Sequence, residues 1–565
     1  MSTNNLFLKK LWLYRYGISA AGLIVCAAIL RIILLALGWT ATESDEAMNN
    51  LAAMHIEKLG ERPIFFYGQN YLGNFESYVG AILYRIFGPS VQLMRIEMIA
   101  FSVGFLICMY FITKKLYTKG FALFILLFFL LGSQWTIRNQ MEAGGYPEVP
   151  LFAAALFLTA CTLALSYHQL PGWKRCLLYA LWGLLAGLAL WIQLLLAPYV
   201  LISGLLILAF CWKDLFTRVI WCVVPALLIG SAPLIYYNLH AAPGMDSLTT
   251  LINLSHMGYN PHQGFIYHLK ITFFFVLPIA TSFVPACSIQ PGTSIWSAQP
   301  HPLRCMVVDG AWSLSYLSLM LIGLLLAIVA LRKANSLNAS PERHQQLAQQ
   351  FARLMLIVGI CISLFSLVQG NAENLDATNT WRYLICTWIS LPAVLWPLWT
   401  AEKWFASLQV RRSVFTLKWA ALLLVVFVLL HSTALIFQQS VPIAQMDRQH
   451  VATLEKTLEQ QHITRFYTEY WTCGRIIFDT QEQLICGDTY DFNNQLSHGF
   501  DRYPLYPSIV EHASYPSFVY PDGAQQITTL NQLLARSHTA YQRIEVPGYV
   551  IYKMYGRIPS LPLYA

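Results

Sequence analysis

An apolar run that leads directly into an acidic motif sets the architecture of this chain. Residues 18–38 read ISAAGLIVCAAILRIILLALG, and residues 39–47 read WTATESDEA. A helix needs about 20 largely apolar residues to cross a bilayer, so the first segment predicts a membrane span. It is not a signal peptide, because it is long, ends at Trp39 without a small-residue cleavage site and is followed by many more spans.

The composition of the whole chain agrees with this interpretation. The 565 residues are 56% apolar and only 11% charged, with a mean hydropathy of +0.50. An ordinary globular domain carries about 25% charged residues, so these values exclude a soluble enzyme. The net charge of +8 comes without a basic block or zinc-finger spacing, which argues against a nucleic-acid partner and for a role of the charges in membrane orientation.

Apolar runs predict eleven membrane crossings. They lie at about residues 18–38, 92–113, 119–134, 149–167, 175–193, 196–212, 219–237, 313–331, 353–369, 384–400 and 414–437. The fifth and sixth are tightly coupled around Pro198, and either could be a broken or tilted span. The apolar run Ile271–Ala286 is interrupted by Pro278 and Pro285, and we expect a helix that lies at the outer surface or re-enters the membrane.

The distribution of Lys and Arg predicts the orientation. With the N-terminus inside, the inner segments hold 18 of these residues and the outer segments before residue 438 hold eight. Cytoplasmic loops retain Lys and Arg during insertion, so the N-terminus is predicted inside and an odd number of crossings places residues 438–565 outside.

Four cysteines form two close pairs in segments predicted to be external. Cys287 lies near Cys305, and Cys473 lies near Cys486. Disulfides persist outside the cytoplasm, so we expect a bridge in each pair; the alternative is buried free thiols. The other eight cysteines lie in or beside predicted spans.

Three parts of the chain follow from these patterns. Residues 1–437 form the membrane body, residues 39–91 form a long first outer loop within it, and residues 438–565 form a soluble tail. The predicted fold class is an α-helical polytopic membrane protein with a small extracytoplasmic α/β C-terminal domain.

Short amphipathic patterns predict the elements outside the spans. In the loop, Glu46–Gly60 and Asn74–Phe87 are predicted as helices lying in the membrane interface. The tail is predicted to open with a polar helix over Asp447–Gln461 and to contain strands such as Arg475–Phe478 and Tyr549–Tyr552.

The acidic motif after the first span carries the sharpest chemical signal. A carboxylate at the end of a membrane helix, when loops shield it from water, is suited to act as a general base. Asp45 and Glu46 are the candidates. The alternative is helix capping, with Ser44 or Asp45 as the N-cap and Glu46 in the first turn, and the two roles are compatible.

Two further outer clusters are candidates for binding. Residues 138–148 read RNQMEAGGYPE, and Gly144 and Gly145 there permit a tight turn and a close backbone approach to a ligand, although an ordinary hairpin turn explains them equally well. Residues 381–383 read WRY at the outer start of a span. Arg382 either snorkels to the interface or faces an anionic lipid headgroup, since its donor fork suits phosphate oxygens.

These motifs, in this order, resemble the GT-C superfamily of membrane glycosyltransferases. The branch in question is the bacterial one similar to glycosyltransferase family 39, with the protein O-mannosyltransferases and the lipid A aminoarabinose transferase. The resemblance covers most of residues 10–400. Its motifs are SDEA at 44–47, FFYGQNYLGNFESY at 65–78, FGPS at 87–90, Arg95, GGYPE at 144–148 and RYL at 382–384.

The resemblance implies an inverting sugar transfer from a polyprenyl-phosphate-linked donor to an extracytoplasmic acceptor, which could be a lipid, a glycan or a protein, at a bacterial inner membrane. It assigns the catalytic base to Asp45, beside Glu46. The donor phosphate then needs a cation, with Arg382 the first choice and Arg138 and Lys270 the weaker ones. The predicted substrate cleft comprises Tyr67, Gln69, Glu76, Glu142, Tyr146, Glu148 and Tyr383; for the first three, bracing of the loop is an equal alternative.

Departures from the family leave several points open. The Glu-Lys-Pro-Pro segment of the aminoarabinose transferase and the inserted lumenal domain of the eukaryotic mannosyltransferases are both absent from the sequence, so neither acceptor class carries over. No cofactor is certain, and a divalent metal held by Asp45 with Glu142 or Glu148 is an open alternative.

Two other classes of function compete with the transferase. A transporter or flippase of a lipid-linked saccharide should carry ionisable residues in the middle of its spans, where Arg31 is the one clear example. A scaffold or lipid-binding protein would consume no lipid-linked sugar.

Overall fold

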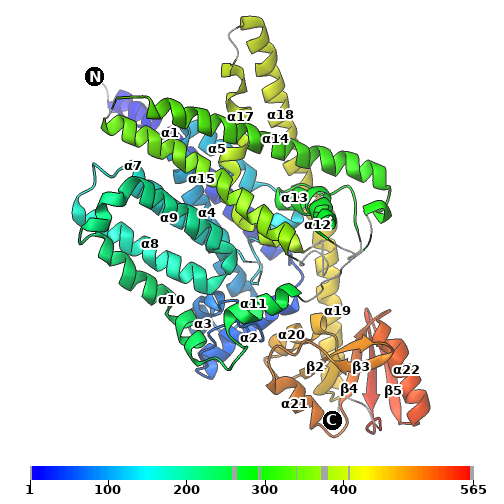
Figure 1. Cartoon of the computed structure of the whole chain (residues 1–565). Coiled ribbons are helices and arrows are strands. Elements are labelled where there is room, and N and C mark those ends of the chain that lie inside the picture. Colours follow the sequence, from blue (N-terminus) through cyan, green and yellow to red (C-terminus); the bar gives the residue numbers. More distant parts are fainter. Residues whose placement is uncertain are drawn as a thin grey trace.

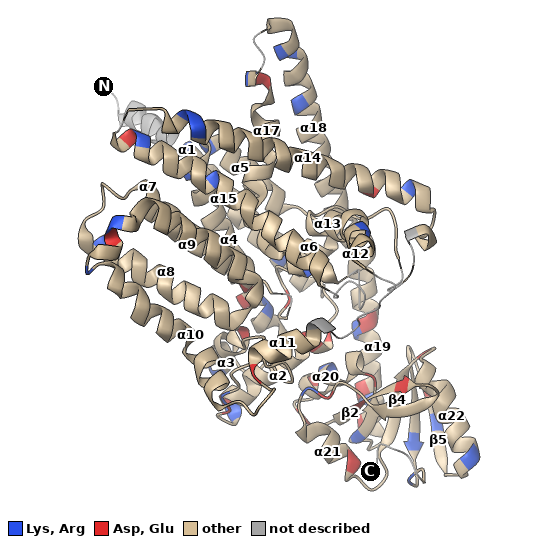
Figure 2. Cartoon of the chain, viewed as in Figure 1, with Lys and Arg blue, Asp and Glu red and all other residues tan. Residues whose placement is uncertain are grey.

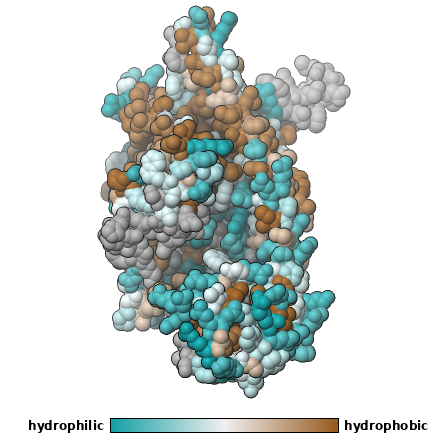
Figure 3. Space-filling view, turned by 90° about the vertical axis from the view of Figure 1, so that its right-hand side faces the viewer, coloured by the Kyte–Doolittle hydropathy of each residue, from teal (hydrophilic) through white to brown (hydrophobic). Residues whose placement is uncertain are grey.

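The structure, a computed structural model, describes residues 3–144, 146–256, 264–289, 293, 295–338, 340–370, 379–404 and 407–559. A helical membrane body is joined to a small α/β domain, and the N-terminal end of α1 and the C-terminal domain lie at opposite ends of the molecule (Figure 1). The predicted fold class, a polytopic helical membrane protein with a small C-terminal α/β domain, is confirmed. Apolar surface predominates on the membrane body, whereas hydrophilic surface covers much of the C-terminal domain (Figure 3).

Ten helices in the described part of the chain are long and apolar enough to cross a membrane. Each coincides with one of the predicted runs. They comprise α1 (Thr3–Ala36), α4 (Val91–Leu116), α7 (Glu148–Leu165), α8 (Gly172–Ile192), α9 (Ala197–Cys211), α10 (Val223–His240), α14 (Pro302–Asn335), α15 (Pro341–Gln369), α17 (Leu391–Thr400) with the preceding 3₁₀ segment η6 (Thr380–Ser390), and α18 (Leu408–Leu435). These helices carry few charged residues along most of their length (Figure 2).

The predicted crossing at 119–134 is shorter than a span. It forms α5 (Lys119–Leu130), a helix of 12 residues, followed by the short α6 (Gln134–Arg138). Arg31 of α1 donates to the carbonyl oxygen of Phe129 at 2.8 Å and to that of Leu130 at 3.4 Å, so its guanidinium satisfies carbonyls at the end of α5. The buried Arg31 thus has a structural partner, and the predicted total of eleven crossings stays a prediction.

Two segments that are predicted to lie outside form short helices. In the first loop, α2 (Ser44–Lys58) and α3 (Phe75–Phe87) agree with the two predicted helices. Further along, α11 (Ser247–His256) is followed by α12 (Phe265–Ile271), the π-helical η4 (Thr272–Val276) and α13 (Leu277–Ala280), which are shorter than a crossing, as expected for the run interrupted by prolines.

Three disulfides join cysteines of the described chain. The predicted bridges Cys287–Cys305 and Cys473–Cys486 are both present. The third, Cys176–Cys222, was not expected, because both cysteines lie beside spans. It joins the starts of α8 and α10, whose backbones meet closely: a Cβ on Gly183 would lie 2.6 Å from the carbonyl oxygen of Val223.

The membrane body and the C-terminal domain are joined by one continuous helix. It runs from Leu408 to Gln460 through α18, the π-helical η8 (Ile436–Ser440) and α19 (Val441–Gln460). The boundary placed at residue 437 falls inside η8, and the predicted helix Asp447–Gln461 is the second half of α19. One uninterrupted helical stretch therefore connects the domain to the membrane body.

A six-stranded sheet forms the core of the C-terminal domain, with strand order β3-β2-β1-β4-β6-β5. Strand β1 pairs in parallel with β2 and β4, and the other neighbours are antiparallel. The elements are β1 (Arg465–Thr468), α20 (Tyr470–Asp479), β2 (Ile485–Phe492), β3 (Gln495–His498), α21 (Leu505–Glu511), β4 (Ser517–Pro521), α22 (Gln525–Ser537), β5 (Tyr541–Val546) and β6 (Tyr549–Met554).

Of the two strands predicted in the tail, one is correct. Tyr549–Tyr552 lies in β6, but Arg475–Phe478 is part of α20. The short apolar run does not distinguish strand from helix by itself. Cys473, Ile476 and Ile477 are buried at helical spacing, and the bridge to Cys486 ties α20 to β2.

Candidate functional site

A cavity of about 810 Å³ lies where the first outer loop, the membrane helices and the C-terminal domain meet. Its polar side is lined by Asp45, Gln69, Tyr71, Tyr146, Arg382, Tyr383 and Arg502. Its apolar side is lined by Leu194, Leu195, Leu201, Leu251, Leu254, Ile362 and Leu367. One space therefore joins charged groups to a long apolar wall.

The start of α2 presents Asp45 to this cavity. The helix begins at Ser44 after the N-cap Glu43, whose side chain makes no capping bond. The capping role expected for Ser44 or Asp45 is therefore absent, and both side chains point to other partners. The Asp45 side chain retains 23% of its accessible surface, so it is neither closed off nor fully solvated.

The partners of Asp45 come from the C-terminal domain. The hydroxyl of Tyr470 donates to Asp45 Oδ1, and Arg502 Nη2 lies 3.4 Å from the same oxygen. Desolvation and the neighbouring Asp45 raise the pKa of Tyr470, so it stays a protonated donor. Two groups more than 400 positions away in the sequence thus hold one oxygen of the carboxylate.

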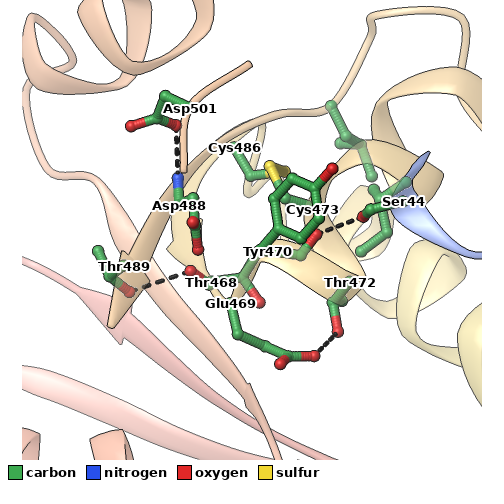
Figure 4. Close-up of a disulfide and its surroundings, with 12 residues drawn as sticks. Ser44, Thr468, Glu469, Tyr470, Thr472, Cys473, Cys486, Asp488, Thr489 and Asp501 are labelled. Carbon is green, nitrogen blue, oxygen red and sulfur yellow. Dashed lines mark hydrogen bonds between the residues drawn. A yellow bond between two sulfur atoms is a disulfide. The ribbon is translucent and has the colours of Figure 1, made fainter. Parts of the chain in front are cut away.

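The same region of the domain is fixed against the backbone of α2. Ser44 Oγ donates to the carbonyl oxygen of Tyr470, beside the Cys473–Cys486 disulfide (Figure 4). Gly474 makes a close approach possible, because a Cβ there would lie 3.2 Å from Ser44 Oγ. Helix α20 is thereby packed on the first turn of α2.

Arg382, at the start of η6, is the cation with the fewest partners in the cavity. Its guanidinium lies 5.5 Å from the ring centre of Tyr146 and 5.8 Å from that of Tyr383. Within the described ranges no carboxylate lies within 4 Å of it, and its Nε has no hydrogen-bond partner. Arg382 is therefore available to an anionic ligand.

Arg502 is engaged by the cavity wall. Its Nε donates to the hydroxyl of Tyr470 at 3.0 Å, and its two Nη atoms lie 2.6 and 3.1 Å from the side-chain oxygen of Gln69 in the amide orientation that satisfies both groups. The sequence motifs did not include Arg502 or Tyr470, and Tyr71 lies in the motif at 65–78 without having been singled out as a site residue. Arg502 follows Asp501 in a loop with no motif, so only the tertiary packing of the domain brings it to Asp45.

Glu46 lies outside the cavity. Its carboxylate is fully buried and binds Arg95 of α4 through two bonds, at 2.8 Å from Nε and 2.6 Å from Nη2. This pair fixes α2 to α4 and leaves Glu46 away from the cavity lining, so its predicted catalytic role stays a prediction.

Three buried carboxyl groups form a second layer behind the cavity. Glu76 of α3 accepts from the backbone N–H of Gly144 at 2.8 Å, and its carboxyl group is hydrogen-bonded to that of Glu148. Burial and then the nearby Glu148 raise the pKa of Glu76 well above its ordinary value. Glu97 is also buried and lies near the start of α4.

The layer holds the glycine turn against α2. Gly144 has φ +75°, and a Cβ there would lie 3.1 Å from Asn49 Nδ2 and 3.6 Å from Asp45 Cβ. The backbone at Gly144 therefore approaches α2 closely and also lines the cavity. Gly145 lies outside the described residues.

Besides Glu46, Glu76 and Glu148, four further predicted site residues lie outside the cavity lining: Arg138, Glu142, Lys270 and Tyr67. Arg138 is paired with Glu43 and Glu142, and Glu142 is buried by that contact. Lys270 of α12 is exposed. Tyr67 donates to Glu61 Oε2 at 2.6 Å and contacts His55, in a cluster that joins α2 to the C-terminal domain.

The residues that were considered as metal ligands do not converge. Glu142 is engaged by Arg138 and Glu148 by Glu76, rather than by Asp45. Across the parts of the chain that the structure describes, no group of three His, Cys, Asp or Glu side chains is placed to hold a metal ion. We derive no chemical step through a metal.

Comparison with protein families and with curated protein sequences finds no match. Among solved structures, the chain is similar to ArnT from Cupriavidus metallidurans bound to undecaprenyl phosphate, with 11% identity and a TM-score of 0.43 over 96% of this chain and 97% of that one. It is also similar to the oligosaccharyltransferase of Archaeoglobus fulgidus in complex with Zn and sulfate, with 13% identity and a TM-score of 0.48 over 94% of this chain and 73% of that one.

Proposed function

We propose that this chain is an inverting GT-C-type glycosyltransferase that moves a sugar from a polyprenyl phosphate to an extracytoplasmic acceptor. One observation carries the proposal: Asp45 and Arg382, which has no carboxylate partner among the described residues, line the polar side of a cavity whose other side is apolar. This combination matches an amphipathic donor with a phosphate between a sugar and a hydrocarbon chain.

The apolar wall supports a lipid-linked donor over a soluble one. Leu201 of α9, Leu254 of α11 and Ile362 of α15 lie along it. Burying hydrocarbon against such residues contributes roughly 0.8 kcal/mol per methylene group, so a long polyprenyl chain supplies the affinity. The polar side is then left to orient the phosphate and the sugar.

Arg382 is proposed to bind the phosphate of the donor. The bond between the anomeric carbon and the phosphate oxygen breaks with both electrons on the phosphate, and a guanidinium that has no carboxylate within 4 Å among the described residues stabilises the charge that develops there. A phosphate monoester has a second pKa of about 6, so the lipid phosphate leaves without a dedicated acid. Tyr146 and Tyr383 hold Arg382 in place through their ring faces.

Asp45 is proposed as the general base. It accepts the proton of an acceptor hydroxyl as that oxygen attacks the anomeric carbon from the face opposite the phosphate, which inverts the configuration. Tyr470 and Arg502 bind one carboxylate oxygen and leave the other for the acceptor. The tail at 438–565 therefore positions the base of the membrane body at 1–437, and on this proposal both face the outside of the cell.

The test is turnover by the full chain reconstituted in liposomes. A panel of polyprenyl phosphates carrying different labelled sugars is added, and free polyprenyl phosphate and glycosylated product are identified by mass spectrometry. We expect cleavage of at least one donor, dependent on Asp45 and independent of the exposed Lys270. Movement of an intact lipid-linked saccharide across the bilayer without cleavage would instead support the flippase alternative and contradict the proposal.

A further inference from the structure

A second pocket lies at the end of the membrane body opposite the C-terminal domain. It has a volume of about 250 Å³ and is formed by α14, α15, α17 and the residues after α17. The ends of α17 and α18 and the N-terminal end of α1 are at this end of the molecule (Figure 1). Nothing in the proposed sugar transfer uses this pocket.

Small residues open the pocket between two helices. At Gly323, α14 touches α17 so closely that a Cβ would lie 2.8 Å from the carbonyl oxygen of Ala393. Ala327 and Ala330 follow one and two turns later and line the pocket, where the facing wall includes Trp396. The contact at Gly323 therefore closes one end of the pocket between α14 and α17. Apolar groups line the pocket where these two helices separate.

Positive charge collects at the polar part of this pocket. The guanidinium of Arg353 lies 4.4 Å from the ring centre of Tyr117 and donates from Nε to the carbonyl oxygen of Leu116 at 2.8 Å. Lys403 lines the same pocket and is exposed at its mouth. In the described ranges no carboxylate lies within 4 Å of either cation.

Among the described residues, the nearby acid forms its ion pair with another cation rather than with Arg353 or Lys403. The carboxylate of Glu402, next to Lys403 in the sequence, is bound by Lys418 Nζ at 2.9 Å. Arg353 also contacts Gln350 Oε1 at 3.1 Å, which is a neutral partner. A guanidinium has five N–H donors, more than these bonds use, so Arg353 retains capacity for a further acceptor.

We propose that this pocket binds one anionic glycerophospholipid of the surrounding bilayer. Its phosphate lies between Arg353 and Lys403, and one acyl chain lies along Ala327 and Ala330. Basic pockets between membrane helices on the cytoplasmic side bind anionic headgroups, and the predicted orientation places this end of the molecule inside. Trp404, which is 44% exposed beside Lys403, supplies the amphipathic ring that is enriched at the headgroup level.

The experiment is lipid binding to the delipidated full chain in neutral detergent, measured by native mass spectrometry. Phosphatidylglycerol and phosphatidylcholine with identical acyl chains are compared. A cation near an anionic lipid contributes about 1 kcal/mol, so Lys403→Gln should weaken phosphatidylglycerol binding by about fivefold and leave phosphatidylcholine binding unchanged. Ala330→Phe, which fills the pocket, should reduce retention of the first bound phosphatidylglycerol.

Matched variants separate the pocket from general surface charge and from the transfer site. Arg411→Gln removes a cation that lies at the same end of the molecule but does not line the pocket. This change should leave the preference for phosphatidylglycerol over phosphatidylcholine intact. Asp45→Asn should also leave it intact. Arg353 donates to the carbonyl oxygen of Leu116 at the end of α4, so its replacement would also remove that contact, and the test does not use it. Equal binding of the two lipids, or equal losses in Lys403→Gln and Arg411→Gln, would overturn the proposal.

Discussion

Two neighbouring acidic residues, Asp45 and Glu46, belong to regions that are built in opposite ways. Asp45 faces an open cavity beside a cation with no carboxylate partner in the described chain, and its own partners come from another domain. Glu46 faces a closed layer, where Arg95 satisfies both of its oxygens. The difference teaches that a carboxylate with open space and a nearby cation has the surroundings that chemistry needs, whereas one with both oxygens paired contributes to the packing of helices; the catalytic role of Asp45 stays a prediction.

The strongest way to break this comparison is Asp45→Asn. Loss of a general base typically costs 10²–10⁴-fold in rate, so we expect the turnover of the lipid-linked sugar to fall by about that factor. The thermal unfolding midpoint should stay near that of the parent chain, because the side chain is partly exposed and an amide still accepts from Tyr470. Unchanged turnover would remove Asp45 from the mechanism.

The reciprocal change is Glu46→Gln. Removing one charge of a buried ion pair leaves the other uncompensated, at a cost of about 3–5 kcal/mol. We therefore expect a large loss of thermal stability, while the fraction of molecules that remain folded turns over at nearly the parent rate. A stable Glu46→Gln protein that has lost turnover would give Glu46 the catalytic role that the geometry does not support.

Arg382→Gln sharpens the comparison on the side of the cations. Loss of a group that stabilises developing charge lowers kcat by about 10²–10³-fold, and we expect a decrease near the smaller of these factors. Arg138→Gln is the matched control, since Arg138 is paired with Glu43 and Glu142 outside the cavity lining. If the two variants lose the same activity, the availability of Arg382 has no special role.

Tyr470→Phe tests whether the C-terminal domain positions the base. A hydrogen bond to a charged group contributes about 1.5–3 kcal/mol, so kcat should fall by at least about tenfold. The KM for the donor should change little, because Tyr470 does not line the main cavity. The exposed Tyr490 of β2 provides the control Tyr490→Phe. A rise in KM by the same factor, with an unchanged kcat, would instead indicate that Tyr470 contributes to donor binding.

The smallest effect concerns the contact between the domain and α2. A hydrogen bond from His55, 3.2 Å away, lowers the pKa of Glu482 below its ordinary value. This interaction stabilises the folded chain at pH values above the ordinary Glu pKa of about 4.5. The stabilisation is lost as the pH falls through the lower pKa that Glu482 has in the folded chain. Glu482→Gln should therefore lower the free energy of unfolding by up to about 1 kcal/mol at pH 6 and by less at pH 4. Thermal unfolding at the two pH values measures this difference.

Glu459→Gln is the matched control for that comparison. Glu459 is an exposed carboxylate of α19. Its replacement should leave the pH dependence of stability as in the parent chain. A Glu482→Gln loss that is as large at pH 4 as at pH 6 would contradict the role of the His55 contact.

The sequence predicted the parts of the molecule that depend on local pattern. Ten apolar runs became long helices, two disulfides formed where cysteines lie close in sequence, and both loop helices are present. Five predicted site residues meet in the cavity: Asp45, Gln69, Tyr146, Arg382 and Tyr383. Four of them lie at or just before the start of a helix, and Gln69 lies in the loop between α2 and α3. Their chemical roles stay predictions.

The parts that were missed depend on contacts between distant segments. Arg502 and Tyr470 reach Asp45 because one continuous helix through α18 and α19 leads into the domain and α20 packs on α2. Glu46 lies on the buried side of α2, although it follows Asp45 directly, because successive helical residues point in different directions. The bridge Cys176–Cys222 likewise depends on the close packing of α8 and α10.

The most direct test of the proposed site is a cryo-electron microscopy map of the full chain in a nanodisc with a polyprenyl phosphate. We expect the phosphate within hydrogen-bond distance of Arg382 and the polyprenyl chain along Leu201, Leu254 and Ile362. A map with this lipid bound elsewhere, and with the cavity between Asp45 and Arg382 free of it at saturating concentration, would contradict the site.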